Sequence, residues 1–227
     1  MPAGTLAVAA RLQHWVCENA KKKRKYLKRV DVSHPLAHTL QTLNVQELPR
    51  EVHKKGDHTG NFDARPLLTP ALQGHDMGLV SEAGMPAIAD PGSSVVRAAH
   101  ELGVPVAPLV GPVSLLLALA ASGLNGQNFA FVGYLPQDAA ERAQRIRELE
   151  ALALRHGQTQ MFIETPYRNA VLLQALLQTL QPHTRLSTST GLTLDTARTH
   201  SMTVKSWKQT AGAAPDNSTP AVFLIGR

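Results

Sequence analysis

The stretch LVSEAGMPAIADPG, residues 79–92, decides the fold of this chain of 227 residues. Its apolar start predicts a buried strand over residues 77–81, and its glycines and prolines predict a loop before a helix over residues 93–102. In open α/β sheets, ligands bind where the strands end at their carboxyl edge. Gly84 would let a ligand approach the backbone closely, while Pro86 and Pro91 would restrict the loop to one shape. A purely structural strand-to-helix turn is the alternative that this pattern leaves open.

Strands alternate with helices on both sides of this stretch, which indicates an α/β fold with largely parallel sheets. The Gly- and Pro-punctuated segment 111–126 predicts two α/β domains, residues 1–112 and 113–227. We expect residues 31–62 to be dominated by loops. The other expected helices cover residues 5–13, 19–29, 63–72, 113–121, 139–156 and 169–180, and the other expected strands cover residues 14–18, 42–48, 104–109, 129–132, 159–163, 185–190 and 221–225.

The composition is that of an ordinary globular protein, with 43% hydrophobic and 18% charged residues. The longest apolar run, residues 115–121, is too short to span a membrane, and residues 1–16 lack the pattern of a secretory signal. The single cysteine, Cys17, cannot form an internal disulfide, and we expect it to be buried in its strand. These features predict a cytoplasmic protein with no membrane partner.

One segment accounts for the net charge of +6, because seven basic residues lie between Lys21 and Arg29. The other 16 basic and 17 acidic residues nearly cancel. A basic patch of this density predicts binding to a polyanion through its phosphates. A solvated helix face is the alternative.

Residues 81–92 resemble the signature loop of the ribosomal-RNA small-subunit methyltransferase I family, a branch of the tetrapyrrole methylase superfamily. The usual form of that loop reads SDAGTPAISDPG. Three later segments, PLVGPVS (108–114), FVGYLP (131–136) and FIETPYR (162–168), are similar to motifs of the family and follow its order. The resemblance covers residues 79 to about 225 well, and residues 16–19 more weakly.

The resemblance implies two domains with S-adenosylmethionine in the cleft between them, and a homodimer. Methyl transfer from a sulfonium depends mainly on in-line positioning, and the sequence assigns no catalytic residue. No metal is expected, because the histidines lack the spacing of metal ligands. The implied cofactor contacts are Glu82, Ala83, Gly84, Met85, Pro86, Ile88, Val113, Ser114, Glu164, Thr165, Pro166, Leu192 and Thr193.

The chain also departs from the family pattern. Members of the family begin with a strand and a glycine-bearing loop, whereas residues 1–5 lead directly into what would be the first helix. We expect either a misplaced start or a truncated variant. Val113 and Ser114 stand where the common form has Ser and Ala, and residues 191–194 keep its Leu-Thr pair without the flanking charges.

Resemblance and charge together predict an S-adenosylmethionine-dependent methyltransferase that acts on RNA, by resemblance at a ribose 2′-oxygen of ribosomal RNA. Two alternatives stay open: a tetrapyrrole C-methyltransferase, by analogy of fold, and a truncated relative that binds nucleic acid without catalysis. The candidate RNA-binding residues lie on the expected basic helix and are Lys21, Lys22, Lys25, Lys28 and Arg29.

Overall fold

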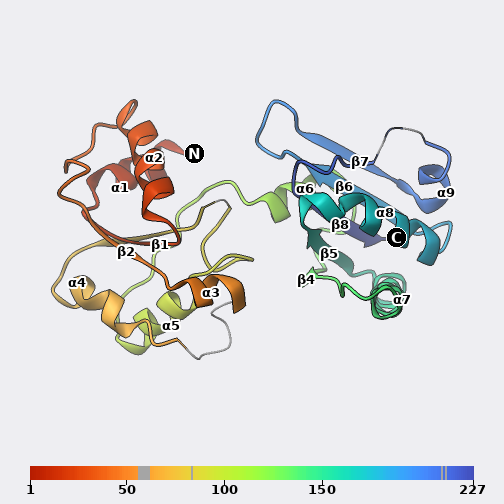
Figure 1. The fold of residues 1–227 in the computed structure, drawn as a ribbon, viewed down its shortest axis with the longest axis horizontal. Coiled ribbons are helices and arrows are strands. Elements are labelled where there is room, and N and C mark those ends of the chain that lie inside the picture. Colours follow the sequence, from red (N-terminus) through yellow and green to blue (C-terminus); the bar gives the residue numbers. More distant parts are fainter. Residues whose placement is uncertain (56–61, 83, 211, 213) are drawn as a thin grey trace. The chain divides into compact units, whose positions relative to one another are not determined.

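The computed structural model describes residues 1–55, 62–82, 84–210, 212 and 214–227 (Figure 1). The chain forms two compact units, unit 1 (Met1–Pro112) and unit 2 (Val113–Arg227). Each unit contains a sheet with helices packed on it, so the α/β class is confirmed. We describe the two units separately.

The sheet of unit 1 has three parallel strands, with β1 (His14–Cys17) between β2 (Asn44–Glu47) and β3 (Met77–Val80). Cys17 pairs with Glu47 on one side and with Val80 on the other, so the carboxyl ends of all three strands lie at one edge. The loop that follows β3 therefore starts beside the residues that follow β1. Cys17 is buried, as expected.

Helices cover both faces of this sheet (Figure 1). Trp15 packs toward α1 (Ala3–Arg11) and α2 (Ala20–Asp31), whereas Val16 packs toward the 3-10 helix η1 (Arg65–Leu68) and α5 (Ser93–Glu101). Successive side chains of a strand point to opposite faces, which explains this division. Two further short helices, α3 (Arg50–Lys55) and α4 (Thr69–Leu72), complete the unit.

The sheet of unit 2 has the order β4-β5-β8-β6-β7. Among the described residues of this sheet, β4 and β5 pair in parallel, whereas β5–β8, β8–β6 and β6–β7 pair antiparallel. The expectation of largely parallel sheets thus holds for unit 1 and is wrong for unit 2, because hydrophobic runs do not encode strand direction. The strands are β4 (Phe129–Tyr134), β5 (Thr159–Glu164), β6 (Arg185–Thr190), β7 (Arg198–Thr203) and β8 (Ala221–Gly226).

The unit 2 sheet is also covered on both faces. Met161 and Leu224 pack with α6 (Ser114–Ser122), while Phe162 and Phe223 stack on the opposite face with ring centroids 6.0 Å apart. The helices on that opposite face are α7 (Ala139–His156), α8 (Asn169–Thr179) and α9 (Val204–Trp207), and a short 3-10 helix, η2 (Pro166–Arg168), precedes α8.

Three expectations about secondary structure are wrong. Residues 104–113 contain no strand, because Pro105 and Pro108 lack the amide donors that a strand ladder needs. The helix expected over residues 63–72 is split into η1 and α4, each of which has a proline in its first turn. Third, the sequence pattern predicts no element where α3, β7 and α9 lie, because hydrophobic periodicity is weak in these segments.

Candidate functional site

Carboxylates gather at the carboxyl edge of the unit 1 sheet. Glu18, directly after β1, accepts a hydrogen bond from the backbone N–H of Glu82, directly after Ser81, at 2.7 Å. The carboxylate of Glu82 forms an ion pair with Lys22 of α2. The signature loop is thereby joined to both β1 and the basic helix, although these segments lie about 60 residues apart in the sequence.

Asp90 adds a third carboxyl group to this edge. The pKa of Asp90 is raised from 3.8 to about 6, first by burial and then by the negative charges of Glu18 and Glu82, while a hydrogen bond from Ser81 opposes the rise. Asp90 is therefore about half ionised near pH 6 and mostly ionised above it. Above pH 6 the Asp90 carboxylate adds a negative charge beside Glu18 and the Glu82–Lys22 ion pair, which favours a cationic ligand.

The loop that follows β3 has a closed base and an open tip. At the base, a Cβ on Gly92 would lie 3.1 Å from both the backbone nitrogen of Ala87 and the side chain of Leu79, and φ of Gly92 is +136°. At the tip, a Cβ on Gly84 would meet only an oxygen of Asp90, at 3.4 Å, and φ is +84°. Glycine is thus required at the base by packing, while the tip leaves space beside the backbone.

Two alanines in the loop have positive φ, +66° at Ala87 and +60° at Ala89. Side-chain-bearing residues rarely adopt this conformation, which costs about 1–3 kcal/mol each and occurs often at ligand sites. The turn is held by hydrogen bonds from the Ala87 amide to Pro91 and from the Ile88 amide to Met85, both 3.2 Å. The strain and these bonds indicate a loop of fixed shape.

The structure places most of the expected cofactor contacts of unit 1 in this one loop, namely Glu82, Gly84, Met85, Pro86 and Ile88. Ile88 is 47% exposed, so its apolar side chain is accessible beside the loop. Ala83 lies outside the described residues. Glu18 and Asp90 are not among the expected contacts. The place of Glu18 at the end of a predicted strand is the signal that would have found it, whereas Asp90 lies shortly before α5 and has no such signal.

The expected contacts of unit 2 lie at helix starts and strand ends. Val113 directly precedes α6 and Ser114 is the first residue of this helix, while Leu192 and Thr193 follow β6. Val113 and Leu192 pack against the same hydrophobic cluster as Ile163 of β5, so the structure brings these segments together. Thr193 has a positive φ of +76°.

The carboxylate of Glu164, the last residue of β5, is 4% exposed and already has partners. One oxygen accepts hydrogen bonds from the backbone N–H of Thr165, at 2.7 Å, and from its hydroxyl, at 3.1 Å. The other oxygen pairs with Arg168 at 3.4 Å. Glu164 therefore shapes the turn that contains Thr165 and Pro166.

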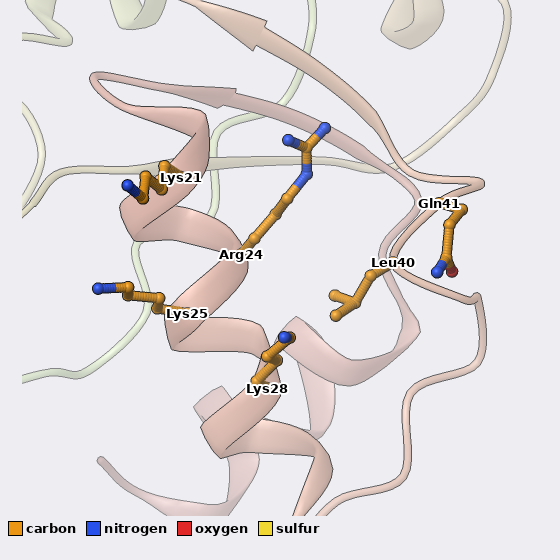
Figure 2. A pocket seen from close by; sticks show the side chains of 6 residues that line it. All are labelled: Lys21, Arg24, Lys25, Lys28, Leu40 and Gln41. Carbon is orange, nitrogen blue, oxygen red and sulfur yellow. The ribbon is translucent and has the colours of Figure 1, made fainter.

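Lys21, Lys25 and Lys28 line a surface hollow of about 470 Å³ on α2, together with Arg24, Leu40 and Gln41 (Figure 2). The other two candidate RNA-binding residues do not line the hollow, since Lys22 pairs with Glu82 and Arg29 is exposed elsewhere on the helix. Arg24 was not selected from the sequence, although its spacing from Lys21 and Lys28 places all three on one helix face.

Within the described ranges, no helix is long and apolar enough to cross a lipid bilayer. In that same part of the chain, no three His, Cys, Asp or Glu side chains converge as metal ligands would.

The fold and the loop define the class: a two-unit α/β protein with a shaped, glycine-containing loop at the carboxyl edge of its first sheet. The model of the tetrapyrrole (corrin/porphyrin) methylases matches residues 7–206. The chain belongs to this family.

Relatives named ribosomal RNA small subunit methyltransferase I include proteins from Vibrio cholerae, 37% identical over 124 residues, and from Micromonospora olivasterospora, 35% identical over 156 residues. These alignments cover 55% and 68% of this chain, but 42% and 49% of the relatives. The chain therefore spans about half the length of the curated relatives that it matches.

Two solved structures share the fold. The methyltransferase CobJ matches with a TM-score of 0.58 and 19% identity, over all of this chain and 87% of the other. Uroporphyrin III C-methyl transferase from Thermus thermophilus matches with a TM-score of 0.53 and 16% identity, over all of this chain and 91% of the other. The observed architecture is thus that of the tetrapyrrole methylases.

Proposed function

We propose that this chain is a methyltransferase that binds S-adenosylmethionine at the loop after β3 and methylates RNA. The observation that carries the cofactor assignment is the closed base and open tip of the loop, with Gly84 exposed beside an acidic edge. S-adenosylmethionine carries an ammonium, a sulfonium and a carboxylate, and the carboxylates of Glu18 and Asp90 attract its net positive charge.

Bound S-adenosylmethionine supplies an electrophilic methyl group, and the residues of the chain orient it. The hydrogen bonds of Ala87 and Ile88 fix the loop before binding, which lowers the entropic cost of positioning the donor. The full set of proposed cofactor contacts follows the family pattern. It comprises Glu82, Ala83, Gly84, Met85, Pro86 and Ile88 in unit 1, and Val113, Ser114, Glu164, Thr165, Pro166, Leu192 and Thr193 in unit 2.

The shared name of the relatives supports ribosomal RNA as the acceptor. The concentration of positive charge on α2 supports a polyanionic acceptor independently of that name. We also propose that the protein is located in the cytoplasm, where ribosomal RNA is found.

A comparison of two glycine-to-valine variants tests the cofactor site. Gly84 and Gly74 have nearly equal φ angles, +84° and +86°, and no atom lies within 4 Å of a Cβ on Gly74. Valine at either position costs similar strain, about 1–2 kcal/mol, but only Gly84→Val fills the space at the tip of the loop. We expect calorimetry to show S-adenosylmethionine binding by the wild type and by Gly74→Val, and its loss in Gly84→Val. Equal affinity of the two variants would remove the loop as the site.

The acceptor is tested separately with labelled S-adenosylmethionine. Small-subunit ribosomal RNA is expected to gain label, and a porphyrinogen is the comparison acceptor. Label in the porphyrinogen alone would overturn the RNA assignment and leave the cofactor assignment intact.

A further inference from the structure

The seven basic residues of α2 do not form one surface. With 3.6 residues per turn, Lys21, Arg24, Lys25 and Lys28 fall within about 100° of the helix circumference. These four side chains line the hollow in Figure 2. Lys22 and Arg29 lie on a neighbouring stripe, and Lys23 lies on the opposite side, where it is buried with Leu27.

The helix holds these charges together despite their repulsion. Like charges three or four residues apart destabilise a helix by about 0.2–0.5 kcal/mol per pair, and Lys21, Arg24, Lys25 and Lys28 form several such pairs. In the described structure none of the four forms an ion pair, whereas the neighbouring Lys22 does. Helix α2 is stabilised instead by the Asn19 cap, which accepts from the Lys22 amide at 3.0 Å, and by the burial of Leu27 and Val30.

The hollow is larger than a single inorganic anion needs. Its volume of about 470 Å³ falls in the range of small-molecule sites. Leu40, which is half buried, and Gln41, which is exposed, come from the segment after α2 and complete the lining (Figure 2). An apolar side chain and an amide beside four cations suit a nucleotide, with contacts for a base or ribose as well as for phosphate.

We infer that this hollow binds a single-stranded segment of RNA, with Lys21, Arg24, Lys25 and Lys28 on its phosphates and with Leu40 and Gln41 on an unstacked nucleotide. The inference rests on the proposed RNA acceptor and names where that acceptor binds. From Lys21 to Lys28 the helix rises about 10 Å, so the four cations can contact neighbouring phosphates of one short segment. A single strand fits because an unstacked base can contact Leu40 and Gln41, whereas a base inside a duplex is stacked and paired.

Two charge-matched double variants test the site. Arg24→Gln/Lys28→Gln removes one arginine and one lysine from the hollow, and the outer variant, Arg147→Gln/Lys205→Gln, removes the same residue types from exposed positions of unit 2. The full chain is titrated into a fluorescein-labelled, unstructured 12-nucleotide RNA at several salt concentrations. Four phosphate contacts predict a slope of log K against log salt of about −2.8 for the wild type.

We expect the hollow variant to bind with a slope near −1.4 and with about 10- to 30-fold weaker affinity at 0.1 M salt. The outer variant is expected to keep the wild-type slope. Leu40→Ala is expected to weaken binding without changing the slope, because it removes no charge. Equal effects of the two double variants would overturn the site, as would tighter binding to an RNA duplex of the same length or to vesicles that contain phosphatidylserine.

Calorimetry separates this inference from the proposed function. The hollow variant is expected to bind S-adenosylmethionine with the wild-type affinity, since none of its altered residues contacts the loop after β3. If the wild type binds RNA through the hollow but does not bind S-adenosylmethionine, the proposed function fails and the RNA site stands. If cofactor binding is intact and the two double variants behave alike, the hollow fails and the cofactor site stands.

Discussion

Lys23 is a buried cation on the inner side of α2, and we expect Lys23→Met to stabilise the protein. The side chain is 3% exposed, and its ammonium has no hydrogen-bond partner among the described residues. The ammonium lies 4.7 Å from the centroid of a Trp15 ring. The pKa of Lys23 is lowered from 10.5 to about 8, mainly by burial; Cys17 opposes this lowering and Arg24 adds to it.

The change in pKa sets an upper limit on the gain. The step from 10.5 to about 8 corresponds to about 3 kcal/mol, at ~1.4 kcal/mol per pH unit. Methionine loses the cation–π contact, which contributes about 0.5–2 kcal/mol, and local relaxation around the ammonium reduces the penalty further. The net gain expected at pH 7 is therefore about 1–2 kcal/mol.

The pH dependence gives the sharper test. Between pH 8 and pH 10.5 the unfolded chain binds more protons at Lys23 than the folded chain does, so this group makes wild-type stability rise with pH. The advantage of Lys23→Met is therefore complete below pH 8 and shrinks as the pH approaches 10.5.

Urea unfolding at pH 7 and pH 10, followed by Trp15 fluorescence in a Trp207→Phe background, measures this advantage. Lys25→Met is the matched control, because it makes the same replacement at an exposed position of the same helix. The reasoning is refuted if Lys23→Met gains the same free energy at both pH values, or if it destabilises the protein at pH 7.

Two further predictions concern assembly and the core of unit 2. Light scattering at micromolar concentration is expected to give the mass of a homodimer, because β2 and β3 are edge strands of the described unit 1 sheet and edges favour pairing; a clean monomer would contradict this. Asn169→Ala is expected to cost about 2–3 kcal/mol in urea unfolding, because the fully buried Asn169 amide donates to the carbonyls of Asp216 and Thr219, both at 2.8 Å. A cost below about 0.5 kcal/mol would show that water replaces these bonds.

Local patterns predicted much of the fold. Helix α7 lies at the expected residues, 139–156, because a capping Asp138 and a following Gly157 mark its ends. The strand, loop and helix over residues 77–102 follow from the apolar run and the glycines and prolines of that segment. The failures fall where prolines remove amide donors, as at residues 104–109, or where periodicity is weak, as in β7.

The candidate site also has features that the sequence predicts and features that depend on the tertiary structure. The sequence by itself determined that a shaped loop follows β3 and that the positive charge is concentrated on one helix, because glycine, proline and charge act locally. Only the tertiary structure decided which of these cations is buried, which forms an ion pair and which line the hollow. The packing of α2 on Trp15 buries Lys23, pairs Lys22 with Glu82 and leaves Lys21, Arg24, Lys25 and Lys28 around one hollow. Residues adjacent in a helix point about 100° apart, so the side that meets the sheet determines the environment of each.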